Sequence, residues 1–370
     1  AERAAAARGI AEEGIVLLKN NGVLPLEKGA SLSVNGIYAK PDQTDYLSGG
    51  GSAAVRWLEN TSDLPAALTA RGFSCAYEPA FGVSVVHSFK QNARTAVLNA
   101  AKSDVNIVCV GTGGRVEFEE GDRLTMRLPE VQERVILDSA ACNPNTVVIV
   151  FAGAAVDMSA WEDSVAAILY AGFPGMGGAE ALADILTGKV NPSGKLSETF
   201  PLDLEDVPAA GTYRRAGVTR YQEGRDVGYR YFDTYDVPVL YPFGHGLSYS
   251  EFFYRDLRLS LEDGRVIAEY VVENVSGRDG KEVSQVYVGE DVPLVYRPKK
   301  ELKGFSKDLI KAGKCVKVRV GLDFRAFAHW NAARDTWTVT DGVYTVSVGA
   351  SAEDIRLTAK LRVEDGKFVL

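Results

Sequence analysis

The sequence predicts an α/β domain with a mostly parallel sheet, followed by an all-β sandwich. Up to about residue 250, short apolar runs alternate with helix-like stretches. The runs at 105–111 and 146–153 are rich in β-branched residues and do not alternate regularly with polar residues, which is typical of strands covered on both faces in a parallel sheet. From about residue 252 the apolar pattern changes to a period of two, which predicts half-buried antiparallel strands.

The first domain is predicted to span residues 1–200 as an (α/β)6-type sandwich. Its helices and strands are assigned from the period of the apolar residues and from the flanking glycines. In chain order we expect a helix over 10–20, a strand over 32–39, a helix over 88–102, a strand over 105–111, a helix over 128–141, strands over 146–153 and 165–172, and a helix over 177–188.

The second domain is predicted to span residues 252–370. A hairpin over 257–275 has Asp263-Gly264 at its turn, a strong short-range signal. Alternating strands follow at 283–290, 314–322, 335–340 and 342–350, and several such strands with Gly, Asp and Asn between them predict a β-sandwich. The stretch 201–251 is rich in Tyr, Pro and Gly without periodicity, so we expect an irregular connecting segment that covers an edge of the first domain.

The charge balance argues against several classes of partner. The 370-residue chain has a net charge of -8 and no long Lys/Arg run. Nucleic acid and anionic membranes are therefore poor candidates. No apolar stretch is long enough to span a bilayer, and the first residues lack the apolar core of a signal peptide.

Cysteine and histidine usage indicates neither a disulfide framework nor a metal site. The four cysteines are scattered, and Cys109 lies inside an apolar run, so we expect buried free thiols. The three histidines are isolated from one another and from the cysteines, so neither a metal nor another cofactor is implied. A reducing compartment, the cytoplasm, is favoured, with a periplasmic or secreted location as the alternative.

The stretch 115–123, "RVEFEEGDR", carries three glutamates within four positions: Glu117, Glu119 and Glu120. It follows the predicted strand 105–111, and ligands of parallel sheets bind outside the carboxyl ends of the strands. Mutual repulsion of crowded carboxylates raises at least one pKa, and a carboxyl group that keeps its proton suits a general acid. Arg115 and Arg123 could orient one carboxylate. The alternative is a solvated acidic loop.

Glycine-rich stretches offer a rival interpretation, phosphate binding. Gly111-Thr112-Gly113 begins like a dinucleotide fingerprint, but Val116 stands where the third glycine would fall. The stretch 172–189 places glycines before a helix without the Gly-Lys-Ser/Thr of a P-loop. Tight turns explain both better, so a nucleotide-dependent enzyme is disfavoured. The triple glycine at 49–51 permits close backbone approach to a ligand or another domain.

Three segments together resemble glycoside hydrolase family 3. They are 6–26, "AARGIAEEGIVLLKNNGVLPL"; 172–201, "GFPGMGGAEALADILTGKVNPSGKLSETFP"; and 227–252, "VGYRYFDTYDVPVLYPFGHGLSYSEF". The likeness covers nearly the whole chain. It implies the family's α/β sandwich domain followed by its fibronectin type III-like domain.

The resemblance also implies functional residues. In the family the sandwich domain carries the acid/base glutamate in a stretch that usually reads Gly-Glu-Gly-x-Asp-Arg. Anchored on Asp122-Arg123, this glutamate falls on Glu119, but Phe118 and Glu120 occupy the usual glycine positions. Glu120 is therefore the second choice and Glu117 the third.

The same resemblance places the substrate near Gly50, Gly51 and Ser52, at a loop that lines the leaving-group subsite in some members. Tyr46 and Trp57 flank that turn. Arg115 and Arg123 complete the expected substrate-binding set.

The family's nucleophile is an aspartate on a TIM barrel, and this chain contains no such barrel. The resemblance therefore implies part of a retaining β-glycosidase, a β-glucosidase first and a β-xylosidase as the close alternative. Its expected partners are a β-linked glycoside and a barrel polypeptide, either a separate subunit or a removed segment, and we expect an oligomer. A non-catalytic carbohydrate-binding or scaffolding module is the other hypothesis.

Overall fold

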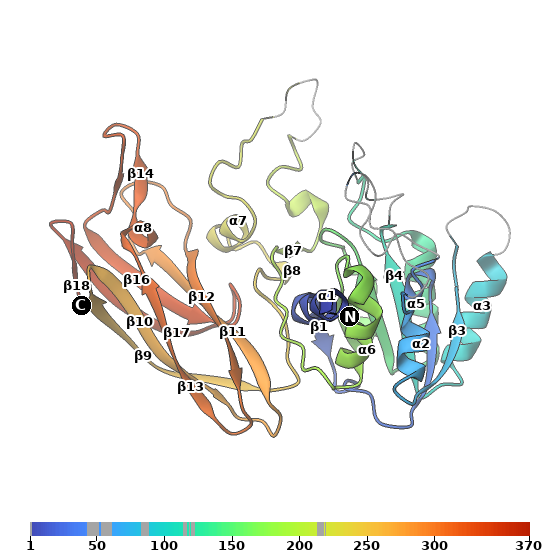
Figure 1. The fold of residues 1–370 in the computed structure, drawn as a ribbon. Helices are drawn as coiled ribbons and strands as arrows, with labels where there is room; N and C mark the ends of the chain where they lie inside the picture. Colours follow the sequence, from blue (N-terminus) through green and yellow to red (C-terminus); the bar gives the residue numbers. More distant parts are fainter. Residues whose placement is uncertain are drawn as a thin grey trace. The chain divides into compact units, whose positions relative to one another are not determined.

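The computed structural model describes residues 2–42, 52, 61–82, 89–113, 117, 119, 123–212, 218 and 220–370. The chain forms two compact units, Ala1–Lys195 and Leu196–Leu370, called here the first and second units. The first is α/β and the second is built mainly of β-sheets (Figure 1), so the predicted fold class is confirmed.

Six strands of the described residues form the central sheet of the first unit, in the order β1-β6-β5-β4-β2-β3. β1 is antiparallel to β6, and every other neighbouring pair is parallel. β4 and β5 are buried along their whole length, which explains why their sequences are mostly apolar. The strands are β1 (Val16–Asn20), β2 (Ser31–Asn35), β3 (Ser74–Glu78), β4 (Val105–Gly111), β5 (Thr146–Phe151) and β6 (Ala167–Tyr170).

Helices cover this sheet in two groups. α1 (Glu2–Gly14) and α2 (Leu64–Thr69) each pack against α6 (Gly178–Leu186), and α3 (Phe89–Ala100) packs against α5 (Glu130–Cys142). The chain runs from β2 outward to β3 and then returns past β2 to β4. The strand order therefore reverses between β2 and β4, and ligands of open α/β sheets bind at such a switch point.

Two predicted elements of the first unit differ from the structure. The helix predicted over 10–20 is wrong, because α1 ends at Gly14 and β1 begins at Val16. Gly14 is a poor helix former, and the buried, partly β-branched run after it pairs with β6 instead. The strand predicted over 32–39 ends at Asn35, after which η1 (Ile37–Ala39) forms a short 3-10 helix.

A side-chain amide holds the carboxyl end of β4. Gln132 of α5 accepts a hydrogen bond from Gly111 N at 2.8 Å and donates from Nε2 to Gly111 O at 2.9 Å. Both residues are buried, so neither main-chain group can turn to water instead. The amide acts as an additional peptide unit beside the last residue of the strand from which the acidic loop departs.

The second unit contains the two sheets of a β-sandwich, with strand orders β13-β10-β9 and β12-β11-β16-β17-β18. Alternate residues of β10, Val266, Ala268, Tyr270 and Val272, are buried in its core. Asp263 and Gly264 take positive φ angles of 48° and 76° at the predicted hairpin turn. The strands are β9 (Phe252–Glu262), β10 (Arg265–Asn274), β11 (Gly280–Glu290), β12 (Glu301–Ile310), β13 (Cys315–Leu322), β16 (Gly342–Gly349), β17 (Ile355–Glu364) and β18 (Lys367–Val369), with α8 (Phe324–Phe327), β14 (His329–Asn331) and β15 (Thr336–Thr338) between β13 and β16.

The predicted connecting segment, 201–251, is grouped with the second unit rather than lying between two domains. It has more regular structure than its sequence indicates. It holds β7 (Phe200–Pro201), η4 (Leu204–Asp206), α7 (Tyr229–Thr234) and β8 (Val239–Tyr241). In the described part of the chain, no helix has the length and apolar character needed to cross a membrane.

The cysteines are free thiols, as expected, but they are not all buried. Cys109 is buried and Cys75 is half-buried, whereas Cys142 and Cys315 are exposed. Burial raises the pKa of the Cys109 thiol, so this residue behaves as an apolar core side chain.

Removing the Gln132 amide, whose two hydrogen bonds to Gly111 form a clamp on the end of β4, should destabilise the first unit. Gln132→Met keeps a similar side-chain length but leaves Gly111 N and O buried without partners. We expect the free energy of unfolding to fall by roughly 2–6 kcal/mol, at about 1–3 kcal/mol for each of the two unpaired groups. Urea unfolding followed by far-UV circular dichroism at a helix wavelength measures this loss. The exposed Gln222→Met is the matched control, with a change within about 0.5 kcal/mol; equal losses in the two variants would contradict the role of the clamp.

Candidate active site at the carboxyl edge of the sheet

The loop after β4 crosses the carboxyl edge of the sheet, where glycines allow the chain to pass closely. A Cβ atom on Gly111 would lie 2.3 Å from Phe151 O, and one on Gly113 would lie 2.6 Å from the Tyr38 hydroxyl. Tyr38 itself stacks on the Phe151 ring, with centroids 5.9 Å apart. The Gly-Thr-Gly stretch therefore serves tight packing at this edge, in agreement with the interpretation as a turn.

Glu117 ties this loop to the end of β5. Its Oε2 accepts a hydrogen bond from Gly153 N at 2.7 Å, and its Oε1 lies 3.0 Å from Arg123 Nη1. Both carboxylate oxygens are thus occupied. Only 13% of the Glu117 side chain is exposed, so an incoming substrate has little access to it. Glu117 is therefore suited to positioning the loop rather than to proton transfer.

Arg123 completes the same attachment. Besides Glu117, its Nη1 donates to Ala155 O at 3.1 Å and its Nη2 donates to Met126 O at 3.1 Å. The guanidinium group thus bridges the acidic loop, the segment after β5 and the chain leading to α5. Its direct contacts are structural, and contact between Arg123 and substrate stays a prediction.

Glu119 differs from Glu117 in both exposure and partner. Its carboxylate is exposed, and its Oε2 accepts hydrogen bonds from Ser52 N at 2.9 Å and from Ser52 Oγ. Ser52 follows β2 and Glu119 follows β4, so the two loops meet at the switch point of the sheet. The structure thereby brings together the predicted acid/base residue and one of the predicted substrate-binding residues, which lie 67 positions apart.

Crowding of the glutamates predicts a raised pKa for at least one of them, and Glu119 is not that one. The side-chain hydrogen bond from Ser52, followed by its main-chain hydrogen bond, holds the pKa of Glu119 below its ordinary value. Donors that bind the ionised form favour that form. In this chain Glu119 is therefore a carboxylate at neutral pH, not a stored acid.

Several predicted site residues lie outside the described residues: Gly50, Gly51, Arg115, Glu120 and Asp122, with the flanking Tyr46, Trp57 and Phe118. Sequence reasoning in turn missed Gly153, Gln132 and Tyr38. None of the three carries a local signal, because each acts on a segment distant in sequence. Within the described ranges, no group of three or more His, Cys, Asp or Glu side chains is placed to hold a metal ion.

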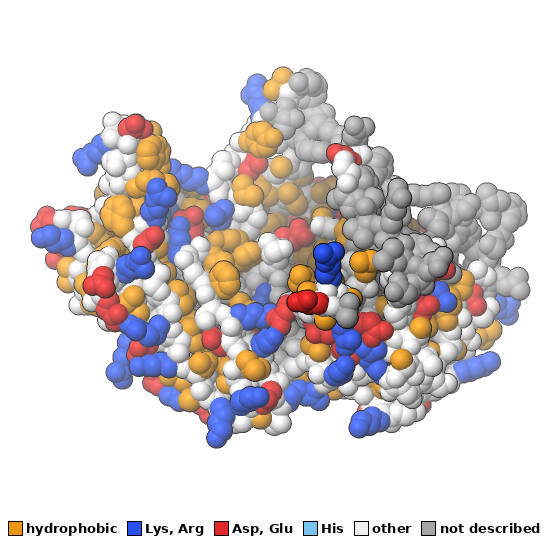
Figure 2. Space-filling model, in the orientation of Figure 1, with side chains coloured by type: hydrophobic (Ala, Val, Ile, Leu, Met, Phe, Trp, Pro, Cys, Tyr) orange, Lys and Arg blue, Asp and Glu red, His pale blue; other side chains and the backbone are white. Residues whose placement is uncertain are grey.

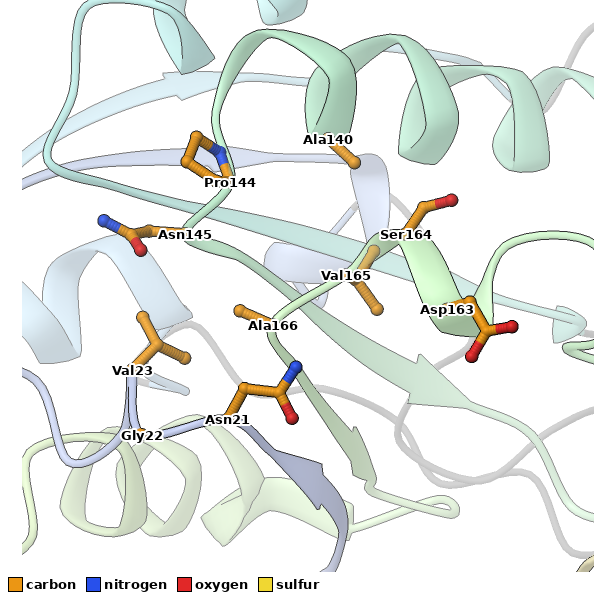
Figure 3. Close-up of a pocket in the computed structure, with 10 residues that line it drawn as sticks. All are labelled: Asn21, Gly22, Val23, Ala140, Pro144, Asn145, Asp163, Ser164, Val165 and Ala166. Carbon is orange, nitrogen blue, oxygen red and sulfur yellow. The ribbon is translucent and has the colours of Figure 1, made fainter.

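A cavity of about 440 Å³ lies on the same unit but away from this edge (Figure 3). Asn145 and Ala166, which line it, directly precede β5 and β6. The cavity is thus at the amino ends of the parallel strands, opposite the acidic loop. Asp163 is the one carboxylate among its lining residues, so it lacks the paired acids of a glycosidase site.

The fold and this edge define an α/β domain, joined to a β-sandwich, in which Glu119 is the accessible, oriented carboxylate among the described glutamates of the acidic loop. Residues 15–249 match the Glycosyl hydrolase family 3 C-terminal domain, and residues 282–352 match the Fibronectin type III-like domain. The chain belongs to glycoside hydrolase family 3.

Relatives of known sequence and structure agree. The chain is 37% identical over 368 residues to thermostable beta-glucosidase B of Acetivibrio thermocellus and 36% identical over 368 residues to an exo-alpha-(1->6)-L-arabinopyranosidase of Bifidobacterium longum, in each case over 96% of this chain and 48% of the relative. The crystal structure of a GH3 beta-glucosidase from Bifidobacterium adolescentis superposes with a TM-score of 0.92 at 36% identity, covering 98% of this chain and 54% of that one. The chain thus spans about half the length of these relatives.

Removing the Ser52 hydroxyl should raise the pKa of Glu119. Ser52→Ala deletes one donor to the carboxylate and leaves the main-chain N–H in place, so the ionised form loses part of its stabilisation. Titration of the 13Cδ resonance, assigned with Glu119→Gln, measures the change. Ser103→Ala is the control, because that hydroxyl donates to Ala100 O and touches no carboxylate. An unchanged or lowered pKa in Ser52→Ala would refute the assigned cause.

Proposed function

We propose that this chain supplies the general acid/base, Glu119, to a retaining β-glycosidase whose nucleophile lies on a TIM barrel. One observation carries the proposal: in a family 3 member, an exposed carboxylate stands at the switch point of the sheet and is oriented by a residue of the neighbouring loop. Glu117 has the wrong contacts for this task because both of its oxygens are engaged.

The reaction takes two steps. Glu119 protonates the glycosidic oxygen as the barrel's aspartate attacks the anomeric carbon, so the C–O bond to the leaving group breaks and a glycosyl ester forms. Glu119, now ionised, takes a proton from water while that water attacks the same carbon and releases the aspartate. The two carboxyl groups of a retaining enzyme lie about 5–5.5 Å apart, so the barrel must approach the loop closely.

The low pKa of Glu119 in this chain has a direct consequence. A general acid must hold a proton at the working pH, whereas Ser52 favours the ionised form here. Docking of a barrel would remove water from the exposed carboxyl group and place a second negative charge beside it. Both effects raise a carboxyl pKa. We therefore propose that the acid form of Glu119 becomes available in the assembled site.

The proposed substrate is a terminal β-linked glucoside. Relatives named beta-glucosidase support this choice. A β-xyloside is the alternative, because the groups that would distinguish the two sugars belong to the proposed barrel. The exposed, ionised state of Glu119 also favours a second candidate function, a non-catalytic carbohydrate-binding module that kept the fold without the reaction.

In the assembled enzyme, Glu119→Gln should lower kcat/KM for cellobiose by about 10²–10⁴-fold, the usual contribution of general acid catalysis. On 2,4-dinitrophenyl β-D-glucoside the loss should stay below about tenfold, because that leaving group departs without a proton. Steady-state kinetics on both substrates test this selectivity, and added azide should restore turnover by replacing the water that needs a base.

Glu120→Gln is the matched control for this experiment. Equal losses on the two substrates in Glu119→Gln would argue against an acid/base role for Glu119. If Glu120→Gln shows the selective loss instead, the acid/base residue is the neighbouring glutamate.

The chain by itself should hydrolyse aryl β-D-glucosides poorly, because it lacks the proposed nucleophile and its Glu119 is ionised at neutral pH. Mixing it with a barrel polypeptide of the same family should produce activity, measured by release of the aryl alcohol. Activity of the chain alone would show that it carries its own nucleophile. Association without activity would favour the binding module.

A further inference from the structure

The second unit holds a cavity of about 300 Å³ that the proposed acid/base chemistry does not use. It lies between residues 224–230, the start of β12 and the β14–β15 hairpin. At the end of the unit where β14 lies, Figure 2 shows hydrophobic and basic side chains next to one another. The lining residues are Gly224, Arg225, Val227, Arg230, Arg297, Pro298, Glu301, Lys303, Ala328, His329, Trp330 and Trp337.

Two tryptophans form one wall of this cavity. Trp330 and Trp337 are direct cross-strand partners in the hairpin, and their rings meet edge to face with centroids 5.8 Å apart. They remain 43% and 38% exposed. Arg325 lies over the Trp337 ring, 5.0 Å from its centroid, so Trp330 offers the more open aromatic surface. The face of the exposed Trp330 ring, supported by the edge-to-face contact with Trp337, provides a flat apolar surface against which a sugar ring can pack.

The rest of the lining is rich in cations. Arg225, Arg230, Arg297 and Lys303 line the cavity against a single lining carboxylate, Glu301. Burial raises the pKa of Glu301, but Lys303, Arg297 and Arg230 together lower it by more, so Glu301 is ionised. Burial, followed by the charge of Arg297, lowers the pKa of His329, which is therefore neutral near pH 7. The lining carries an excess of positive charge.

Most of these cations are already paired, and one is not. Arg297 is buried, donates to Phe327 O and lies 3.5 Å from Glu290 Oε2. Arg230 and Lys303 lie within 3.4 Å and 3.2 Å of Glu301. Arg225 donates through Nη1 to Tyr296 O at 3.0 Å and forms no ion pair with the described residues. Its guanidinium group therefore has no anionic partner among the described residues, and it lines the same cavity as the two tryptophans.

We propose that this cavity binds a saccharide unit that bears a carboxylate, a uronic acid. The sugar ring packs on Trp330, and its carboxylate pairs with Arg225, since guanidinium and carboxylate groups match in geometry and charge. The volume of the cavity is at the lower end of the range for ligand pockets, about 300–1,000 Å³, and this volume suits a single sugar ring. This site goes beyond the proposed function and does not depend on it, because no residue of the acidic loop contributes.

Binding of two probes to the full chain tests the proposal. Isothermal titration should show methyl β-D-glucuronide binding at least tenfold more tightly than methyl β-D-glucoside, which lacks the carboxylate. Arg225→Gln should reduce the ratio of the two dissociation constants to about one, because a hydrogen-bonded charge pair is lost. Trp330→Ala should weaken both probes about tenfold. Arg334→Gln and Phe305→Ala, exposed residues that do not line the cavity, should change neither probe.

Each outcome decides for or against the site. Equal affinity of the native chain for the two probes, or binding that survives both variants, would overturn it. Circular dichroism of each variant separates lost binding from lost folding, and Trp330→Phe, which keeps an aromatic surface, should retain most of the affinity. If benzoate displaces the glucuronide at equal concentration, the cavity recognises an aromatic acid and the saccharide assignment fails.

Discussion

The attachment of Glu117 to Gly153 N and to Arg123 is the interaction on which the candidate active site depends. It joins Glu117, which follows β4, to Gly153, which follows β5, and to Arg123. Because Glu117 is engaged at both oxygens, its charge is compensated within the protein. Of the two glutamates of this loop that the structure describes, Glu119 is the exposed one. Structural and chemical roles are divided between two residues of the same type, two positions apart.

This attachment requires glycine at positions where the main chain comes close to neighbouring atoms. A Cβ atom on Gly153 would lie 2.8 Å from the Phe173 ring and 3.2 Å from Glu117 Oε2, so a larger residue would disturb the bond that holds the loop. A Cβ atom on Gly111 would likewise collide with Phe151. The main-chain N–H and C=O of Gly111 are both hydrogen-bonded to the Gln132 amide. The glycines that resemble part of a nucleotide fingerprint thus have a packing explanation at the edge of this sheet.

Local pattern predicts much of this molecule but not its contacts. The buried runs of β4 and β5, the amphipathic α3 and the Asp263-Gly264 hairpin are each encoded within a few neighbouring residues, so they can be assigned from sequence. The helix over 10–20 fails because β1 is specified by its pairing with β6, about 150 residues away. The pairs Ser52–Glu119 and Glu117–Gly153 are equally non-local. The direction of the pKa shift of Glu119 could not be predicted from the sequence for the same reason: crowding is visible there, whereas the hydrogen-bond donors come from another loop.

The lowered pKa of Glu119 bears on what the chain can do by itself. A carboxylate that accepts two hydrogen bonds while exposed to water is already well stabilised in its charged form. To act as an acid it needs surroundings that penalise that charge, and a second body covering the edge of the sheet would provide them. If Glu119 has the proposed acid/base role, its protonation state requires such a body, just as the proposed reaction requires a nucleophile. The proposed barrel would meet both requirements at once, since its bulk would remove water and the charge of its aspartate would oppose ionisation of Glu119.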